Sequence, residues 1–212
     1  MLAAAPLHAD VSPQWTQSTN GAYSFTVPAG VNTVVASVTG GGGGGGGSQV
    51  HAGGSGGGGG ATVSCTLAVS PGETLNIYVG GGNTGGDVDR NGAPGSPSYI
   101  SGGTYGYDRT YAAAGQGGSG GIDGGYGGAG GGTDGFSCLP PATQPVFSNG
   151  NGGGSGGTGF FDWHGGPGGA PGSPLPATCP ANAGHGGDGA AGGAFTGYPG
   201  NNGIDGCVVL SY

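Results

Sequence analysis

Hydrophobic and polar residues alternate near both ends of the chain, in the pattern typical of half-buried β-strands. Apolar and polar residues alternate over residues 23–27, and a Pro-Ala-Gly turn signal follows. A run rich in β-branched residues then occupies residues 31–38. The pattern predicts a hairpin of two strands over residues 22–38.

A second predicted hairpin covers residues 61–79. Its strands flank a Ser-Pro-Gly turn at residues 70–72, and each strand places its apolar side chains on one face. These apolar positions are Val63, Cys65, Leu67, Val69, Leu75, Ile77 and Val79. A short apolar strand over residues 207–212 closes the chain. We therefore expect an all-β fold in which about five strands form a small sandwich-like base, with essentially no α-helix.

The chain is expected to have two parts. Residues 1–20 are predicted to be an N-terminal tail, and residues 21–212 a single glycine-rich domain. Residues 1–9 resemble the apolar end and the small-residue cleavage site of a secretory signal, without its positively charged start. Both a truncated signal remnant and a plain tail fit these residues.

Composition shows what lies between the strands. Of 212 residues, 63 are Gly and 15 are Pro, and only 6% are charged, which excludes a conventional helical or α/β enzyme. Gly recurs at every third position over residues 115–130, 150–159, 166–172 and 197–206. Three residues per turn is the period of the polyproline II helix, and glycine faces let such helices approach closely enough to exchange backbone hydrogen bonds. The tracts therefore predict a bundle of polyglycine II helices on the β base.

Several segments, taken in order, resemble a known family. They are Phe25-Thr26-Val27-Pro28-Ala29-Gly30-Val31, the glycine run 40–47, residues 67–82 with their Leu-x-Val-x-Pro-Gly-Glu core, and Gly206-Cys207-Val208-Val209-Leu210. Over residues 20–212 the chain resembles the glycine-rich domain of bacteriophage tail proteins and some bacterial surface proteins. Polyglycine II bundles similar to these tracts occur in the tail-fibre tip adhesins of certain phages.

The resemblance implies a non-enzymatic component of a virus particle, a tail-fibre tip or a surface decoration, that attaches to a host. The expected partners are other virion or fibre subunits and a host cell-surface glycan or protein. A homo-oligomer is expected, and fibres of this kind are often trimers. A secreted bacterial protein that assembles into an extracellular fibre or matrix is the alternative. Either function places the chain in a virion or outside the cell.

Aromatic residues between the glycine tracts are candidate receptor contacts, because polyglycine helices carry no side chains for recognition. We expect the loops that carry them to gather at one end of the bundle. The candidates are Tyr99, Tyr105, Tyr107, Tyr111, Phe147, Phe160, Phe161, Trp163, His164 and Tyr198. Phe136 and Phe195 lie in the same interruptions. Packing against glycine ridges or against a neighbouring subunit is the structural alternative for each of them.

The net charge and the cysteines limit the possible partners and the location of the chain. A net charge of −8 argues against a nucleic acid partner, and no apolar run is long enough to insert into a membrane. Cys65, Cys138, Cys179 and Cys207 lie far apart without a C-x-x-C pair, which favours disulfides in an oxidising location over zinc. Of the three connectivities that four cysteines allow, we expect Cys138–Cys179, between Pro-flanked loops, and Cys65–Cys207, between strands of the base.

Two further features carry only weak chemical signals. Asp87, Asp89 and Asn91 precede Gly92 with the spacing that opens a calcium loop, but Ser98 stands where such a loop needs a bidentate acid. An Asx-rich surface turn is the alternative, and we expect no other cofactor. The histidines are widely spaced and none lies near a nucleophile motif, so we expect no enzymatic activity.

Overall fold

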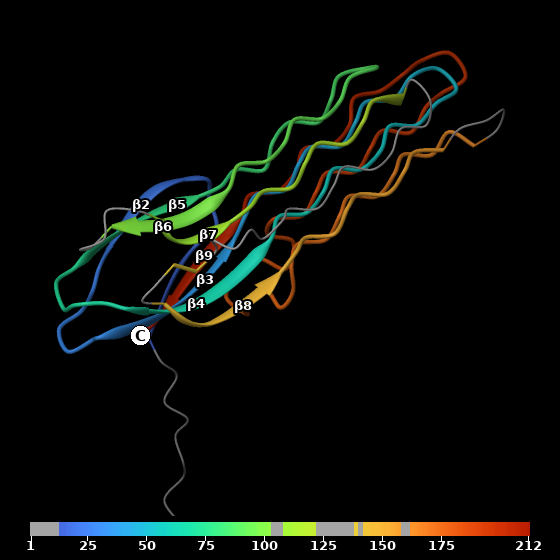
Figure 1. The fold of residues 1–212 in the computed structure, drawn as a ribbon. Helices are drawn as coiled ribbons and strands as arrows, with labels where there is room; N and C mark the ends of the chain where they lie inside the picture. Colours follow the sequence, from blue (N-terminus) through green and yellow to red (C-terminus); the bar gives the residue numbers. More distant parts are fainter. Residues whose placement is uncertain (1–12, 103–107, 122–137, 140–141, 158–161) are drawn as a thin grey trace, which may run out of the picture.

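The computed structural model describes residues 13–102, 108–121, 138–139, 142–157 and 162–212. These residues form a base of two antiparallel β-sheets and a bundle of extended glycine-rich segments that runs away from the base (Figure 1). All regular elements in the described residues are strands. The predicted all-β fold class is therefore confirmed.

The described residues contribute nine strands to the two sheets. They are β1 (Gln14–Gln17), β2 (Gly21–Thr26), β3 (Thr33–Thr39), β4 (Thr62–Ala68), β5 (Thr74–Val79), β6 (Ser98–Gly102), β7 (Asp108–Ala112), β8 (Thr143–Ser148) and β9 (Cys207–Ser211). The five-stranded sheet has the order β1-β9-β3-β4-β8, and the four-stranded sheet has the order β2-β5-β6-β7.

Alternate side chains of both sheets form one hydrophobic core. Val38, Val63 and Val208 stand side by side on the inner face of the five-stranded sheet, and all are buried. Leu75 and Ile77 of β5 join the same core from the four-stranded sheet. The two-residue period of apolar positions therefore determines which face of each strand points inward.

The predicted strand positions are correct, but their predicted partners are wrong. β2 pairs with β5 in one sheet and β3 pairs with β4 in the other, so neither predicted hairpin forms. The two turns instead cross from sheet to sheet, and they lie against each other. Val27 N–H donates to the Glu73 carbonyl (2.8 Å), and Val69 N–H donates to the Asn32 carbonyl (2.9 Å).

The base also holds strands that the sequence analysis did not predict. β1 lies within residues 1–20, the expected tail, and pairs with residues 208–211 of β9. β6, β7 and β8 are short and rich in polar residues, and β8 contains Pro145. Their alternation is therefore weak, and long-range pairing rather than local pattern decides that they are strands.

Segment 40–47 shows how the bundle is held together. Its N–H groups donate to neighbouring segments in three directions in turn, with a period of three residues. The bonds of one turn run from Gly43 to the Gly58 carbonyl (3.0 Å), from Gly44 to the Ala93 carbonyl (2.9 Å) and from Gly45 to the Asn201 carbonyl (2.9 Å). Each bond is repeated three residues along, so the whole segment is bonded without a β-ladder.

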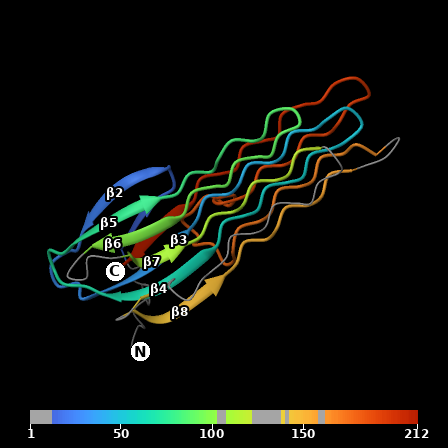
Figure 2. The same cartoon turned by 45° about the horizontal axis from the view of Figure 1, so that its top comes forward.

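The carbonyl groups of the same segment accept hydrogen bonds from three other segments. The donors include Gly118, Gly86 and Gly187, which bond to the carbonyls of Gly44, Gly45 and Gly43. Segment 40–47 thus satisfies its donors and acceptors through neighbours on all sides. Figure 2 shows these segments running side by side. The predicted polyglycine II bundle is confirmed.

Close approach of the backbones requires glycine inside the bundle. A Cβ atom on Gly44 would overlap the carbonyl of Thr84, and one on Gly45 would overlap the carbonyl of Asp188. No rotamer relieves such a clash, because both atoms belong to fixed backbone. Glycine here replaces the side-chain packing of an ordinary core.

Two disulfides join Cys65 to Cys138 and Cys179 to Cys207, so both predicted pairs are wrong. β3 lies between the strands that carry Cys65 and Cys207, and two strand spacings exceed the Cα–Cα distance that a disulfide spans. The side chains also occupy opposite faces of the sheet. Cys65 belongs to the inner core, whereas Cys207 packs with Cys179 and Val209 outside it. The two bridges indicate folding in an oxidising environment.

Candidate functional site at the tip of the bundle

The end of the bundle opposite the sheets consists of turns that connect its segments, and we call this end the tip. Its described parts are residues 48–52, 87–91, 162–164 and 191–198. Figure 1 shows these turns together at the far end of the molecule.

Backbone hydrogen bonds join neighbouring turns of the tip. His51 N–H donates to the Gly193 carbonyl (3.1 Å), and Gly192 N–H donates to the Trp163 carbonyl (2.7 Å). Asp89 N–H donates to the Ser48 carbonyl, and Ser48 N–H donates to the Tyr198 carbonyl. The tip therefore forms one connected surface rather than a set of separate loops.

Large apolar side chains are exposed on this surface. Phe195 is 92% exposed and Tyr198 is 53% exposed. Val50 and Val88 are also exposed. A single exposed apolar side chain is ordinary, but several on adjacent turns are typical of an interaction site.

Two of the exposed tip residues, Tyr198 and Val88, are held in place before any partner binds. The hydroxyl groups of Thr196 and Tyr198 share a hydrogen bond (3.0 Å), and Tyr198 N–H donates to Ser48 Oγ (2.7 Å). Val88 lies directly beside Gly197, where a larger residue would collide with it. A surface fixed in this way loses little conformational entropy when it binds.

Two tip turns adopt backbone conformations that are uncommon for residues with side chains. His51 has φ 64° and Asp89 has φ 63°, and they are the non-glycine residues with positive φ in the described part of the chain. The His51 ring lies 4.9 Å from the Trp163 ring, centroid to centroid. Residues with backbone strain of this kind are found most often at functional sites. Their presence here favours the tip as the functional site.

The structure places three of the predicted contact residues at the tip. Trp163 lies against His51, and Tyr198 lies beside Thr196. His164 Nδ1 lies 2.5 Å from Asp162 Oδ1, and both side chains are largely exposed. This part of the tip therefore presents aromatic surface beside an exposed carboxylate.

Three other predicted contact residues lie in the base, so their expected place at the end of the bundle is wrong. Tyr99 and Tyr111 are register partners on β6 and β7, and Tyr99 stacks on Tyr78 of β5 at 5.3 Å between ring centroids. Phe147 lies on β8 at the edge of the described sheet. Tyr99 and Tyr111 alternate with inward-facing residues such as Ile100, which is a strand pattern and not a loop pattern. Phe147 is the register partner of the core residue Val63, and it is half exposed because β8 is an edge strand.

Some predicted residues are not placed, and some tip residues were not predicted. Tyr105, Tyr107, Phe160 and Phe161 lie outside the described residues. Val50 and Val88 were not predicted, and Phe195 was noted in the same interruption as Tyr198 but was not among the predicted contacts. The sequence does contain a signal for these residues. They lie between consecutive glycine tracts, where the chain must reverse direction. An apolar residue at such a reversal cannot be buried inside the bundle.

The residues that matched a calcium loop form a turn at the tip. Arg90 N–H donates to the Asp87 carbonyl (2.9 Å). Asn91 Oδ1 accepts a hydrogen bond from Gly120 N–H (2.8 Å), so this oxygen holds a neighbouring segment. In the described part of the chain, no three His, Cys, Asp or Glu side chains are grouped closely enough to hold a metal ion. These residues therefore form a surface turn, and calcium binding by Asp87, Asp89 and Asn91 stays a prediction.

Among the described residues, no helix has the length and apolar character needed to cross a membrane.

Comparisons with known proteins place the chain in a family. A search of curated proteins found no match. The glycine-rich domain family matches residues 17–212, a range that includes the tip, the bundle and all strands except most of β1. The chain therefore belongs to the glycine-rich domain family.

Proposed function

We propose that this protein is a non-enzymatic attachment component of a virus particle, a phage tail-fibre tip or a surface decoration, that binds a host receptor through the tip. The observation that carries the proposal is the group of exposed apolar side chains Val50, Val88, Phe195 and Tyr198. Exposure of Phe195 contributes nothing to folding and lowers solubility, so its position favours a role in binding.

The arrangement of the molecule supports this proposal. β1 and β9, the first and last described strands, pair with each other in the base, and the tip lies at the opposite end (Figure 1). The segments between them are joined by backbone hydrogen bonds, so the bundle holds the tip at a set distance from the base. Attachment through the base would direct the tip outward, toward a cell surface.

Binding of the fluorescently labelled protein to a panel of bacterial cells tests the proposal. We expect the double variant Phe195→Ser/Tyr198→Ala to bind at least about tenfold more weakly, because central aromatic contacts dominate interfaces. Phe147→Ser is the matched control, since it removes an exposed aromatic residue from the base, and it should bind like the wild type. Equal binding of the wild type and the tip variant, at unchanged melting temperatures, would rule the proposal out.

The receptor is expected to be a cell-surface glycan or a protein, and the same assay separates the two. Periodate treatment of the cells destroys glycans, whereas protease treatment removes exposed protein. Loss of binding after only one treatment identifies the class of receptor. Phe195 provides a flat apolar face for either class, because aromatic rings pack against sugar C–H groups as well as against protein side chains.

A secreted bacterial protein that assembles into a fibre or matrix is the second candidate function. The observation that favours it is β8, which lies at the edge of the described five-stranded sheet and exposes Val146 and Phe147. An exposed apolar edge strand is a surface for pairing with another copy. Sedimentation that shows open-ended, concentration-dependent assembly, abolished by Phe147→Lys, would favour this function. A closed oligomer such as a trimer, and neighbouring tail or capsid genes, would favour the virion.

A further inference from the structure

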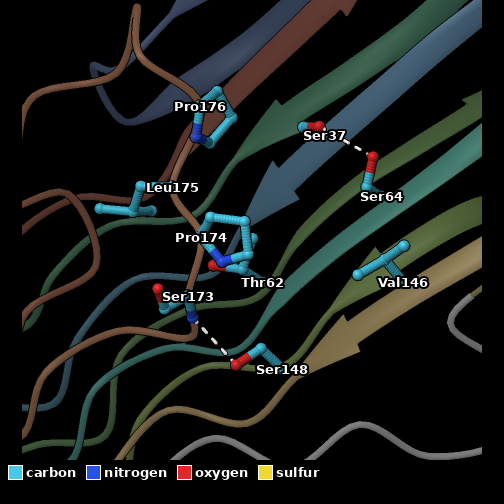
Figure 3. Close-up of a pocket in the computed structure, with 9 residues that line it drawn as sticks. All are labelled: Ser37, Thr62, Ser64, Val146, Ser148, Ser173, Pro174, Leu175 and Pro176. Atoms are coloured by element: carbon cyan, nitrogen blue, oxygen red, sulfur yellow. Dashed lines mark hydrogen bonds between the residues drawn. The ribbon is translucent and has the colours of Figure 1, made fainter.

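A pocket of about 240 Å³ lies in the base, on the outer face of the five-stranded sheet. Figure 3 shows it between the strands that form its floor and residues 173–176, which form its roof. The pocket is separate from the tip, and none of the predicted contact residues lines it.

Strand alternation builds the floor of the pocket. Ser37 of β3 and Ser64 of β4 are register partners, and Ser64 is in turn the partner of Val146 on β8. The neighbouring positions Val38 and Val63 point into the core. The outer face of these strands therefore presents hydroxyl groups beside one exposed aliphatic side chain.

The roof of the pocket is tied down at both ends. Ser173 N–H donates to Ser148 Oγ (2.9 Å) at one end. Beyond the other end, Cys179 N–H donates to the Pro176 carbonyl (3.0 Å), and Cys179 is joined to Cys207 of β9 by a disulfide. A roof fixed in this way keeps the pocket open without a ligand, which lowers the entropic cost of binding.

The floor has hydrogen-bonding capacity left over. The hydroxyl groups of Ser37 and Ser64 share one hydrogen bond (3.0 Å), which uses only one of their two protons. Ser148 Oγ accepts from Ser173 N–H and has its own proton left to donate. Two hydroxyl protons are thus left for a ligand in a pocket that Val146 and Leu175 line with apolar surface.

We propose that this pocket binds a single neutral sugar ring. No charged residue lines the pocket, so it offers nothing to neutralise an ionic ligand. A pyranose carries hydroxyl groups on its edge and C–H groups on its faces, which match the serine hydroxyls and the Val146, Pro174 and Leu175 surface. The volume lies below the roughly 300–1,000 Å³ of sites for drug-sized ligands, so it fits one ring rather than a chain.

Titration of the full-length protein with neutral monosaccharides, followed by saturation-transfer NMR, tests the proposal. The probes are glucose, galactose, mannose and N-acetylglucosamine, and we expect at least one to bind with a Kd of about 1 mM. Ser64→Ala should weaken this binding about fivefold, because it removes a hydroxyl from the floor. Val146→Trp should abolish it, since the larger side chain fills the pocket from an exposed edge position. Phe147→Trp is the matched control on the same strand and should bind like the wild type.

Binding of none of the four sugars by the wild-type protein would overturn the proposal, as would full binding by Val146→Trp. Stronger binding of sialic acid than of every neutral sugar would also overturn it, because the neutral lining would then not determine the ligand. Phe195→Ser/Tyr198→Ala should keep its sugar binding while it loses cell binding. This inference and the proposed function therefore stand or fail separately.

Discussion

Glu73 and Arg109 form a buried ion pair in the base, with 2.8 Å between Oε1 and Nη1 and with 10% and 3% of their side chains exposed. Glu73 Oε2 also accepts from Ser70 N–H (2.8 Å), and Arg109 Nη2 donates to the Ala68 carbonyl. Arg109 lies on β7, whereas Ser70 and Glu73 lie in the turn that carries the chain from one sheet to the other. The pair therefore holds a crossover between the two sheets.

Arg109→Ala is expected to lower the free energy of unfolding by about 3–5 kcal/mol, because it leaves the Glu73 carboxylate buried without its partner. Urea denaturation measures the change. Arg90→Ala is the matched control, since Arg90 is the other arginine of the chain and is exposed at the tip. It should change stability by less than about 0.5 kcal/mol. Similar losses in the two variants would show that the buried pair has no special structural role.

Gly44→Ala tests the glycine packing of the bundle. The added Cβ would overlap the Thr84 carbonyl, so at least about 3 kcal/mol of stability should be lost, at the upper end of the cost of overpacking. Thermal denaturation measures the loss. Ser155→Ala is the control, because Ser155 lies on an outer segment with its side chain exposed, and its melting temperature should match the wild type. A fully stable Gly44→Ala would contradict the backbone contacts described above.

Hydrogen exchange tests whether the bundle is ordered in solution. The amides of Gly43, Gly44 and Gly45 donate to neighbouring segments, so they should exchange only when the domain opens, at least about a thousandfold more slowly than free amides. The amide of Val88, an exposed residue of the 87–91 turn, supplies the comparison and should exchange much faster. Exchange of the three glycine amides at the rate of an unfolded peptide would identify this region as a flexible tether.

Removal of each disulfide should destabilise the domain by a different amount. Cys65–Cys138 spans 73 residues and Cys179–Cys207 spans 28, so the chain-entropy relation gives losses of about 4.4 and 3.6 kcal/mol for the double alanine variants. Urea denaturation of each variant measures these losses. Peptide mapping without reduction should recover Cys65 linked to Cys138. A peptide that links Cys65 to Cys207 would contradict the observed sheet order.

Local patterns were enough to place many elements. Alternation over residues 23–27 and 63–69 located β2 and β4, because inward and outward side chains follow a two-residue period. β6 and β8 lacked this signal. Tyr99 was assigned to a loop for that reason, although pairing with Tyr78 and Tyr111 holds it on the base.

The tip was predicted in outline but not in detail. Turns between glycine tracts had to lie at one end or the other of the bundle, and this placed Trp163 and Tyr198 correctly. Neither the contact between Val88 and Gly197 nor the near-complete exposure of Phe195 follows from local sequence. Both depend on which turns become neighbours when the segments pack.

The amino-acid sequence by itself determined that this protein is an all-β domain whose glycine tracts pack as three-residue helices, because both periods are local properties of the chain. Only the tertiary structure decided which strands pair and which cysteines join. Those outcomes depend on turns such as 70–72 crossing between sheets, and a Pro-Gly turn has the same local sequence whether it returns along one sheet or crosses to the other. The choice comes from burying one shared core beneath two sheets, and that is a property of the whole fold.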